Sequence, residues 1–225
     1  MARYRELILA LVAVIGITAA YGVVVLAIGI PAASGLVGHS LGIVGFVMML
    51  MTETLYSLRK RAMIQPRGSM RAWLQLHIFT GIVGPYLVLL HSAWAFNGIA
   101  GVLSLATAAV VASGFIGRYI YTAVPRTADG MVVEAREIQV QLDEARAALA
   151  RLMTSQAAVA GRGAAEPARN ATRRLRDLER QLSAMRWARR MLATWHAVHI
   201  PIGMALFVLA FVHIGAAIYY ATLLR

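Results

Sequence analysis

The chain has 225 residues, 60% hydrophobic and 14% charged, with a formal net charge of +12 and a mean hydropathy of +0.67. A soluble domain of this length would carry far more charge, so the composition excludes that class. The absence of cysteine excludes disulfides, iron–sulfur ligation by this chain and covalent haem attachment through C-x-x-C-H.

Five apolar runs are each long enough, at about 20 residues, to cross about 30 Å of hydrocarbon as a helix. In chain order they cover 7–30, 36–58, 72–96, 98–124 and 191–224. The first follows Arg3 and Arg5, as in a signal peptide, but it exceeds the apolar stretch of about 7–15 residues found there. The sequence therefore predicts an all-α integral membrane protein with five transmembrane helices, the first of them retained.

Most basic residues flank the predicted helix ends. The loop 59–71 follows the second run, and segment 125–190 holds thirteen arginines against eight acids. Basic loops are typical of the cytoplasmic side, where lipids are anionic. We therefore expect a multi-pass protein of a bacterial inner membrane, with a cytoplasmic N-terminus, membrane lipids as partners and no nucleic-acid binding.

Two histidines lie on the third predicted helix, in "LHIFTGIVGPYLVLLH". His77 and His91 are fourteen residues apart, so they share a helix face to within about 40°, with Cα atoms about 21 Å apart. Gly84 lies midway on the same stripe, where a missing side chain lets a bulky group approach the backbone.

The last predicted helix repeats this spacing in "HIPIGMALFVLAFVH". His199 and His213 are again fourteen residues apart, and in the expected topology both helices run from inside to outside. The sequence therefore predicts that His77 matches His199 in depth near the inner side, and that His91 matches His213 near the outer side.

Ionisable residues inside a membrane are functional candidates by default. Imidazoles that face one another across a bundle are the axial ligands of b-type haem, whereas zinc needs four ligands close together. The alternative is four separate histidines, each bonding a neighbouring helix. We expect two non-covalent haem b groups, with His77 and His199 on the inner iron and His91 and His213 on the outer iron.

This arrangement resembles the transmembrane domain of the ferric reductase and NADPH oxidase superfamily, whose third and fifth helices each carry two haem-ligating histidines about fourteen residues apart. It is also similar to dihaem cytochrome b and to b561-type proteins. The resemblance covers about residues 36–124 and 191–224. It implies that electrons pass from a cytoplasmic donor through both haems to an outer acceptor.

The sequence ends at Arg225, where flavin-dependent relatives continue, and it has no G-x-G-x-x-G fingerprint. The expected donor is therefore a separate flavoprotein or iron–sulfur protein, which makes the chain an electron-transfer subunit of an oxidoreductase complex. The alternatives are a subunit that oxidises quinol or reduces quinone, and a haem-free membrane anchor.

The remaining intramembrane polar residues have two interpretations each. His196 is the alternative inner ligand to His199, but it has no histidine fourteen residues onward. His39 is either an interfacial residue or a quinol- or acceptor-side group. Arg118 either contacts a propionate of the inner haem or pairs with Glu53.

Segment 125–190 is expected to contain an antiparallel helical hairpin with coiled-coil spacing, which divides the chain into 1–124, 125–190 and 191–225. Its apolar positions recur every three or four residues. They are Ile138, Leu142, Ala145, Leu149 and Leu152 in the first arm and Leu175, Leu178, Leu182 and Met185 in the second. Residues 154–170 between the arms favour a turn. The hairpin is a stalk, a continuation of the membrane helices or, with 59–71, the docking surface of the redox partner.

Overall fold

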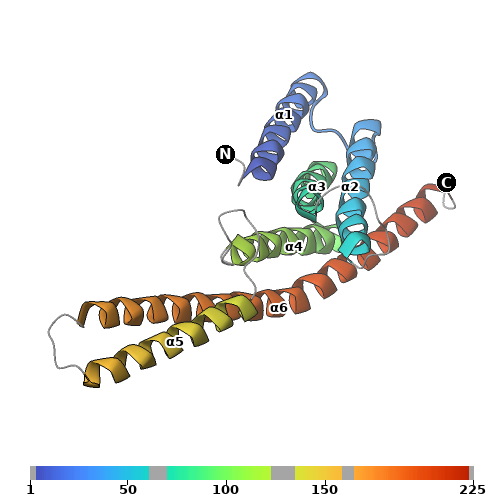
Figure 1. Ribbon diagram of the computed structural model, residues 1–225. Helices are drawn as coiled ribbons and strands as arrows, with labels where there is room; N and C mark the ends of the chain where they lie inside the picture. Colours follow the sequence, from blue (N-terminus) through green and yellow to red (C-terminus); the bar gives the residue numbers. More distant parts are fainter. Residues whose placement is uncertain (1–3, 61–69, 123–134, 159–164, 223–225) are drawn as a thin grey trace. The chain divides into compact units, whose positions relative to one another are not determined.

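The computed structural model describes residues 4–60, 70–122, 135–158 and 165–222, and every regular element in these ranges is an α-helix. The helices are α1 (Arg5–Ile28), α2 (Leu36–Lys60), α3 (Met70–His91), α4 (Gly98–Thr122), α5 (Ala135–Ala158) and α6 (Ala165–Thr222) (Figure 1). Residues 61–69, 123–134 and 159–164 lie outside the described residues, and they hold parts of the predicted loop 59–71, segment 125–190 and turn 154–170.

In the part of the chain that the structure describes, five helices are long and apolar enough to cross a membrane, the same number as the predicted spans. They are α1, Leu36–Thr54 of α2, Ala72–His91 of α3, α4, and the apolar part of Glu166–Tyr220 in α6. Large apolar side chains on these helices are exposed, such as Leu26 at 89% and Leu36 at 86%. Such surfaces suit lipid rather than water, and a helix satisfies its own backbone hydrogen bonds there.

Helix α6 is a single element of 58 residues, whereas the sequence predicts an arm over 171–192 and a span over 191–224. The two join because residues 171–200 contain neither glycine nor proline, so nothing ends the helix between them. Pro201 lies inside α6, and Pro85 lies inside α3 in the same way.

The chain divides into two compact units. The first comprises residues 1–114 and 199–225, and the second comprises 115–198. These boundaries fall inside α4 and α6, about ten residues from the domain limits expected from the sequence.

In the first unit, α2 and α3 pack closely at facing glycines. A Cβ on Gly45 would lie 2.8 Å from the carbonyl oxygen of Gly84, and a Cβ on Gly84 would lie 3.0 Å from that of Gly45. Small residues permit such close approach of membrane helices. Ala10 of α1 is buried with Val83 and Leu87 of α3, and Leu41 and Met48 of α2 pack against the same cluster.

The directions of the packed helices alternate as five successive spans require. Thr18 of α1 bonds Tyr86 of α3 through their hydroxyls at 2.6 Å, and Gln75 donates to Glu6 at 3.3 Å. The later residue of α1 contacts the later residue of α3, so these two helices run parallel. The contacts of α2 with α3 and α6, described below, run in opposite senses.

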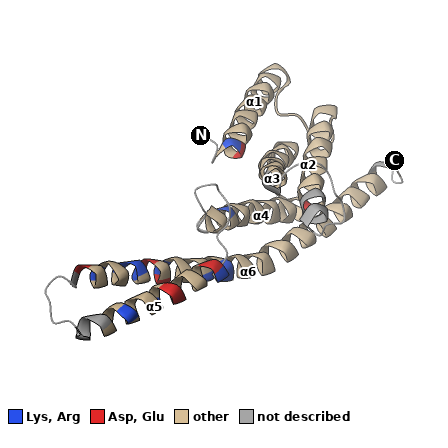
Figure 2. Ribbon diagram, in the orientation of Figure 1, with Lys and Arg blue, Asp and Glu red and all other residues tan. Residues whose placement is uncertain are grey.

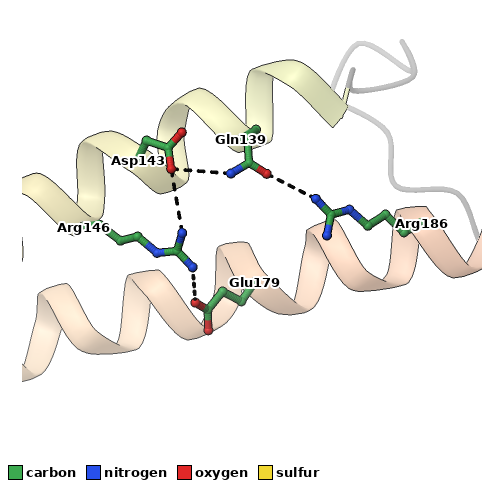
Figure 3. Close-up of polar contacts among 5 residues, drawn as sticks. All are labelled: Gln139, Asp143, Arg146, Glu179 and Arg186. Atoms are coloured by element: carbon green, nitrogen blue, oxygen red, sulfur yellow. Dashed lines mark hydrogen bonds and ion pairs between the residues drawn. The ribbon is translucent and has the colours of Figure 1, made fainter.

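In the second unit, α5 and the N-terminal half of α6 carry most of the charged side chains (Figure 2). Their apolar faces form one buried cluster of Ile138, Leu142, Leu175, Leu178, Leu182 and Met185. Arg146 donates to Glu179 at 3.0 Å, and Arg186 donates to Gln139 at 3.4 Å (Figure 3). Seven residues back along α5 thus correspond to seven residues forward along α6, so these two helices are antiparallel.

Candidate functional site

The stripe of α3 that carries His77, Gly84 and His91 faces α2. The Nδ1 atom of His77 lies 2.9 Å from the carbonyl oxygen of Thr52, and Nδ1 of His91 lies 2.8 Å from that of Gly38. From His77 to Gly84 to His91, the position on α3 increases by seven residues at each step, and the contacted position on α2 decreases by seven, from Thr52 to Gly45 to Gly38. The expectation that both histidines share a face is therefore met, and the face belongs to the α2–α3 packing surface.

These contacts determine the tautomer of both rings. A carbonyl oxygen only accepts, so Nδ1 must carry the proton and Nε2 carries the lone pair of the neutral ring. Metal-bound histidines are commonly oriented in this way, with Nδ1–H donating to a backbone carbonyl and Nε2 on the metal. His77 and His91 are thus chemically suited to ligation through Nε2.

Gly84 has a different neighbour from the one its sequence context suggests. Its missing side chain admits α2, since a Cβ there would also lie 3.1 Å from side-chain atoms of Met48 and Met49. The role of Gly84 in cofactor binding stays a prediction. A related close approach occurs at Gly42, where a Cβ would lie 2.9 Å from the ring of His91.

His199 is held by α4. Its Nδ1 lies 2.7 Å from the hydroxyl of Ser113, and either atom can donate. Gly114, the next residue, lies 4.0 Å from the His199 ring by the same Cβ measure. The sequence analysis missed Ser113, although a hydroxyl followed by glycine on an apolar helix is a recognisable signal for a polar contact between helices.

His213 is half-buried and makes no hydrogen bond to the described part of the chain. Nε2 of His91 likewise finds no hydrogen-bond partner among the described residues. A polar nitrogen without a partner is costly inside a membrane. The ring of His213 and the Nε2 atom of His91 are therefore available to bind a further group.

Helix α2 provides a common depth scale for α3 and α6. Thr52 contacts His77, and the next residue, Glu53, has its carboxylate 3.5 Å from a Cβ placed on Gly203. His77 is therefore level with about residue 203, one turn or about 6 Å beyond His199.

The same measure applies at the other end of these helices. Phe46 contacts the rings of Phe207 and Phe211, with centroids 6.1 and 5.5 Å away. Gly38, which contacts His91, lies eight residues from Phe46 along the antiparallel α2, so His91 is level with about residue 217. It lies about one turn beyond His213. Counted along α2, the members of each predicted pair are offset by about one turn, in the same sense for both pairs, and the pairing itself stays a prediction.

The other two histidines lie beside the candidate ligands. His39 is exposed, and its ring centroid lies 6.4 Å from that of His91 in an edge-to-face arrangement. His196 is half-buried, with Nδ1 2.8 Å from the carbonyl oxygen of Leu192 in its own helix and its ring 4.7 Å from that of Trp195.

The two charged residues of the predicted spans belong to different units. Glu53 lies in the first and makes no ion pair or hydrogen bond there within the described residues. Arg118 lies in the second unit and is half-buried, next to Gly117, against which the Trp195 ring packs. The alternatives for Arg118, a propionate contact or a pair with Glu53, stay predictions.

Within the described ranges, no three or more His, Asp or Glu side chains gather as they would around a metal ion. Haem iron takes one protein ligand from each side of the ring, so the relevant unit is a pair. Comparison of the chain with protein-family models, curated proteins and solved structures finds no match.

Proposed function

We propose that this chain is a membrane cytochrome b subunit that binds two haem b groups. His77 and His199 would hold the inner haem, and His91 and His213 the outer one. The subunit would carry electrons from a cytoplasmic donor, a separate flavoprotein or iron–sulfur protein, to an acceptor on the outer side. In this proposal the α5–α6 hairpin is cytoplasmic, and it docks the donor together with residues 59–71.

The observation that carries the proposal is the shared orientation of the candidate ligands. His77 and His91 both donate Nδ1–H to a carbonyl of α2, and His199 uses the same nitrogen toward Ser113. Three rings on two helices thus keep Nε2, the nitrogen that binds haem iron, on the side away from their supporting helix. His77 lies about one turn beyond His199, and His91 lies about one turn beyond His213. This equal offset supports pairing across the bundle.

The chain's own residues would position the cofactors and exclude water. The α2 carbonyls fix two ring orientations without adding a charge, and the Ser113 hydroxyl does the same for His199. Phe46, Phe207 and Phe211 form an apolar contact at depths between the two pairs, which keeps water out of that region. Bound haem would supply reversible one-electron chemistry at a potential set by these surroundings.

A haem-free membrane anchor is the second candidate, favoured by the same hydrogen bonds. Each of His77, His91 and His199 links two helices. Linking helices is by itself a sufficient role for a polar side chain inside a membrane. The two functions differ at His213, which links no helices within the described residues. An anchor gains nothing from this ring, whereas a dihaem cytochrome loses its outer haem without it.

A quinone-reactive cytochrome b is a variant of the first proposal. The exposed ring of His39 beside His91 is a hydrogen-bonding group of the kind a quinol would use near the outer haem. The purified chain would then be reduced by a quinol analogue, and His39→Ala would lose this reduction. Both results together would favour quinol over a soluble flavoprotein as the donor.

The test is haem content per chain, measured from reduced-minus-oxidised spectra and pyridine haemochrome. The wild-type chain should contain two haem b groups, and His213→Ala should contain one. His196→Ala is the matched control, because it removes a half-buried histidine of the same helix and should retain two. A chain without b-type bands, or a His213→Ala variant with full haem content, would refute the proposal.

A further inference from the structure

Three arginines precede the apolar run of α6. Arg186, Arg189 and Arg190 are exposed, and the chain has no acidic residue after Glu179. The apolar run begins at Met191 within the same uninterrupted helix. These guanidinium groups therefore lie within about 8 Å of the apolar run along the helix axis.

The packing of α4 on α6 gives the depth of these arginines relative to a second span. Ser113 contacts His199, and four residues later Gly117 meets the ring of Trp195, four residues earlier in α6. The helices are therefore antiparallel, and five residues further on Thr122, the last residue of the α4 span, is level with Arg190. Headgroups extend about 5–8 Å beyond the hydrocarbon, so the three arginines lie at headgroup depth.

A groove between α5 and α6 gives these arginines a shaped surface. It has a volume of about 600 Å³, and its lining includes Arg146, Glu179, Arg186, Trp187 and Arg190. Trp187 is 51% exposed. Exposed tryptophan beside arginine is typical of residues that anchor a protein at the membrane surface.

The charge of the groove changes along its length. At the far end, Arg146 is neutralised by Glu179 at 3.0 Å and by Asp143 at 3.8 Å (Figure 3). At the membrane end, Arg186 contacts only the neutral Gln139, at 3.4 Å, and Arg190 has no ion pair within the described part of the chain. Among the described residues, the positive charge without a counterion is thus concentrated next to the apolar run.

We propose that this membrane end of the groove binds the headgroup of an anionic phospholipid, with Arg186 and Arg190 on the phosphate and Trp187 beside the headgroup at the same depth. An acidic protein is a poorer occupant, because a surface at headgroup depth already contacts lipid at high local concentration. The site does not depend on haem binding, so it can fail or succeed independently of the proposed function.

The experiment uses native mass spectrometry of the full-length chain in detergent, titrated with phosphatidylglycerol or phosphatidylcholine. Each interfacial arginine contributes a factor of about five to the binding of an anionic lipid. Arg186→Gln with Arg190→Gln should therefore weaken phosphatidylglycerol binding about 25-fold and leave phosphatidylcholine binding unchanged.

The matched control is Arg173→Gln with Arg174→Gln, which removes the same charge from exposed positions further along α6 and should leave lipid binding within about twofold of wild type. Arg186→Lys with Arg190→Lys should retain most of the binding, which separates loss of charge from loss of folding. Equal weakening in the control pair, or equal affinity for both lipids, would overturn the proposal. Displacement of bound phosphatidylglycerol by polyglutamate would also overturn it, and would assign the groove to an acidic protein.

Discussion

Substitution of Gly45 by alanine should loosen both histidine anchors of α3 at once. The new Cβ would lie 2.8 Å from the carbonyl oxygen of Gly84, and ordinary contact begins at 3.4 Å, so α2 and α3 must part by about 0.6 Å. The same movement would lengthen the Nδ1–O distances of His77 and His91, now 2.9 and 2.8 Å, to about 3.4–3.5 Å, where most of the hydrogen-bond energy is lost.

The expected cost follows from these terms. Overpacking costs about 1–3 kcal/mol and each lost hydrogen bond about 0.5–1.5 kcal/mol, while alanine gains about 1 kcal/mol of helix propensity. The net loss of unfolding free energy is about 1–5 kcal/mol, measured as a lower Tm of the purified protein in detergent. Gly215→Ala is the control, since a Cβ there meets nothing within 4 Å. If Gly45→Ala melts at or above the temperature of Gly215→Ala, the described packing is wrong.

The other predictions concern α4 and the hairpin. Ser113→Ala should lower stability by about 1 kcal/mol and weaken haem retention, because His199 loses its partner on α4; Ser104→Ala, whose hydroxyl bonds only its own helix, should do neither. Met185→Ala should cost about 2–5 kcal/mol in chemical denaturation, because this side chain is fully buried. Glu179→Gln should cost under about 1 kcal/mol, because its ion pair is half-exposed, and a larger loss than that of Met185→Ala would contradict this ranking.

Helical periodicity predicts angular relations within one helix, and here it does so correctly. The common face of His77 and His91, the five spans and the apolar face of the hairpin all follow from the spacing of residues in the chain. Periodicity does not say which neighbour a face meets. The glycines at 38, 42 and 45 on α2 are the signal that could have identified that helix as the partner, since small residues at such spacing favour close helix packing.

The continuity of α6 was one of the alternatives that the sequence left open for segment 125–190. The change from a charged to an apolar composition near Met191 indicates a change of environment, and the sequence analysis took it as a boundary between elements. Only a breaker ends a helix, and the first candidate, Pro201, lies ten residues inside the apolar run. Likewise Ser113 contacts His199 across 86 positions of sequence, a relation that local patterns do not contain.

One consequence follows from the fact that both supporting carbonyls, of Thr52 and Gly38, belong to α2. A slide of α2 by one turn, about 5.4 Å, would detach the rings near both ends of α3 in a single event. The two depths are therefore mechanically linked through a helix that supplies neither candidate ligand. Whatever displaces α2 along its axis would alter the two ring orientations together, never one alone.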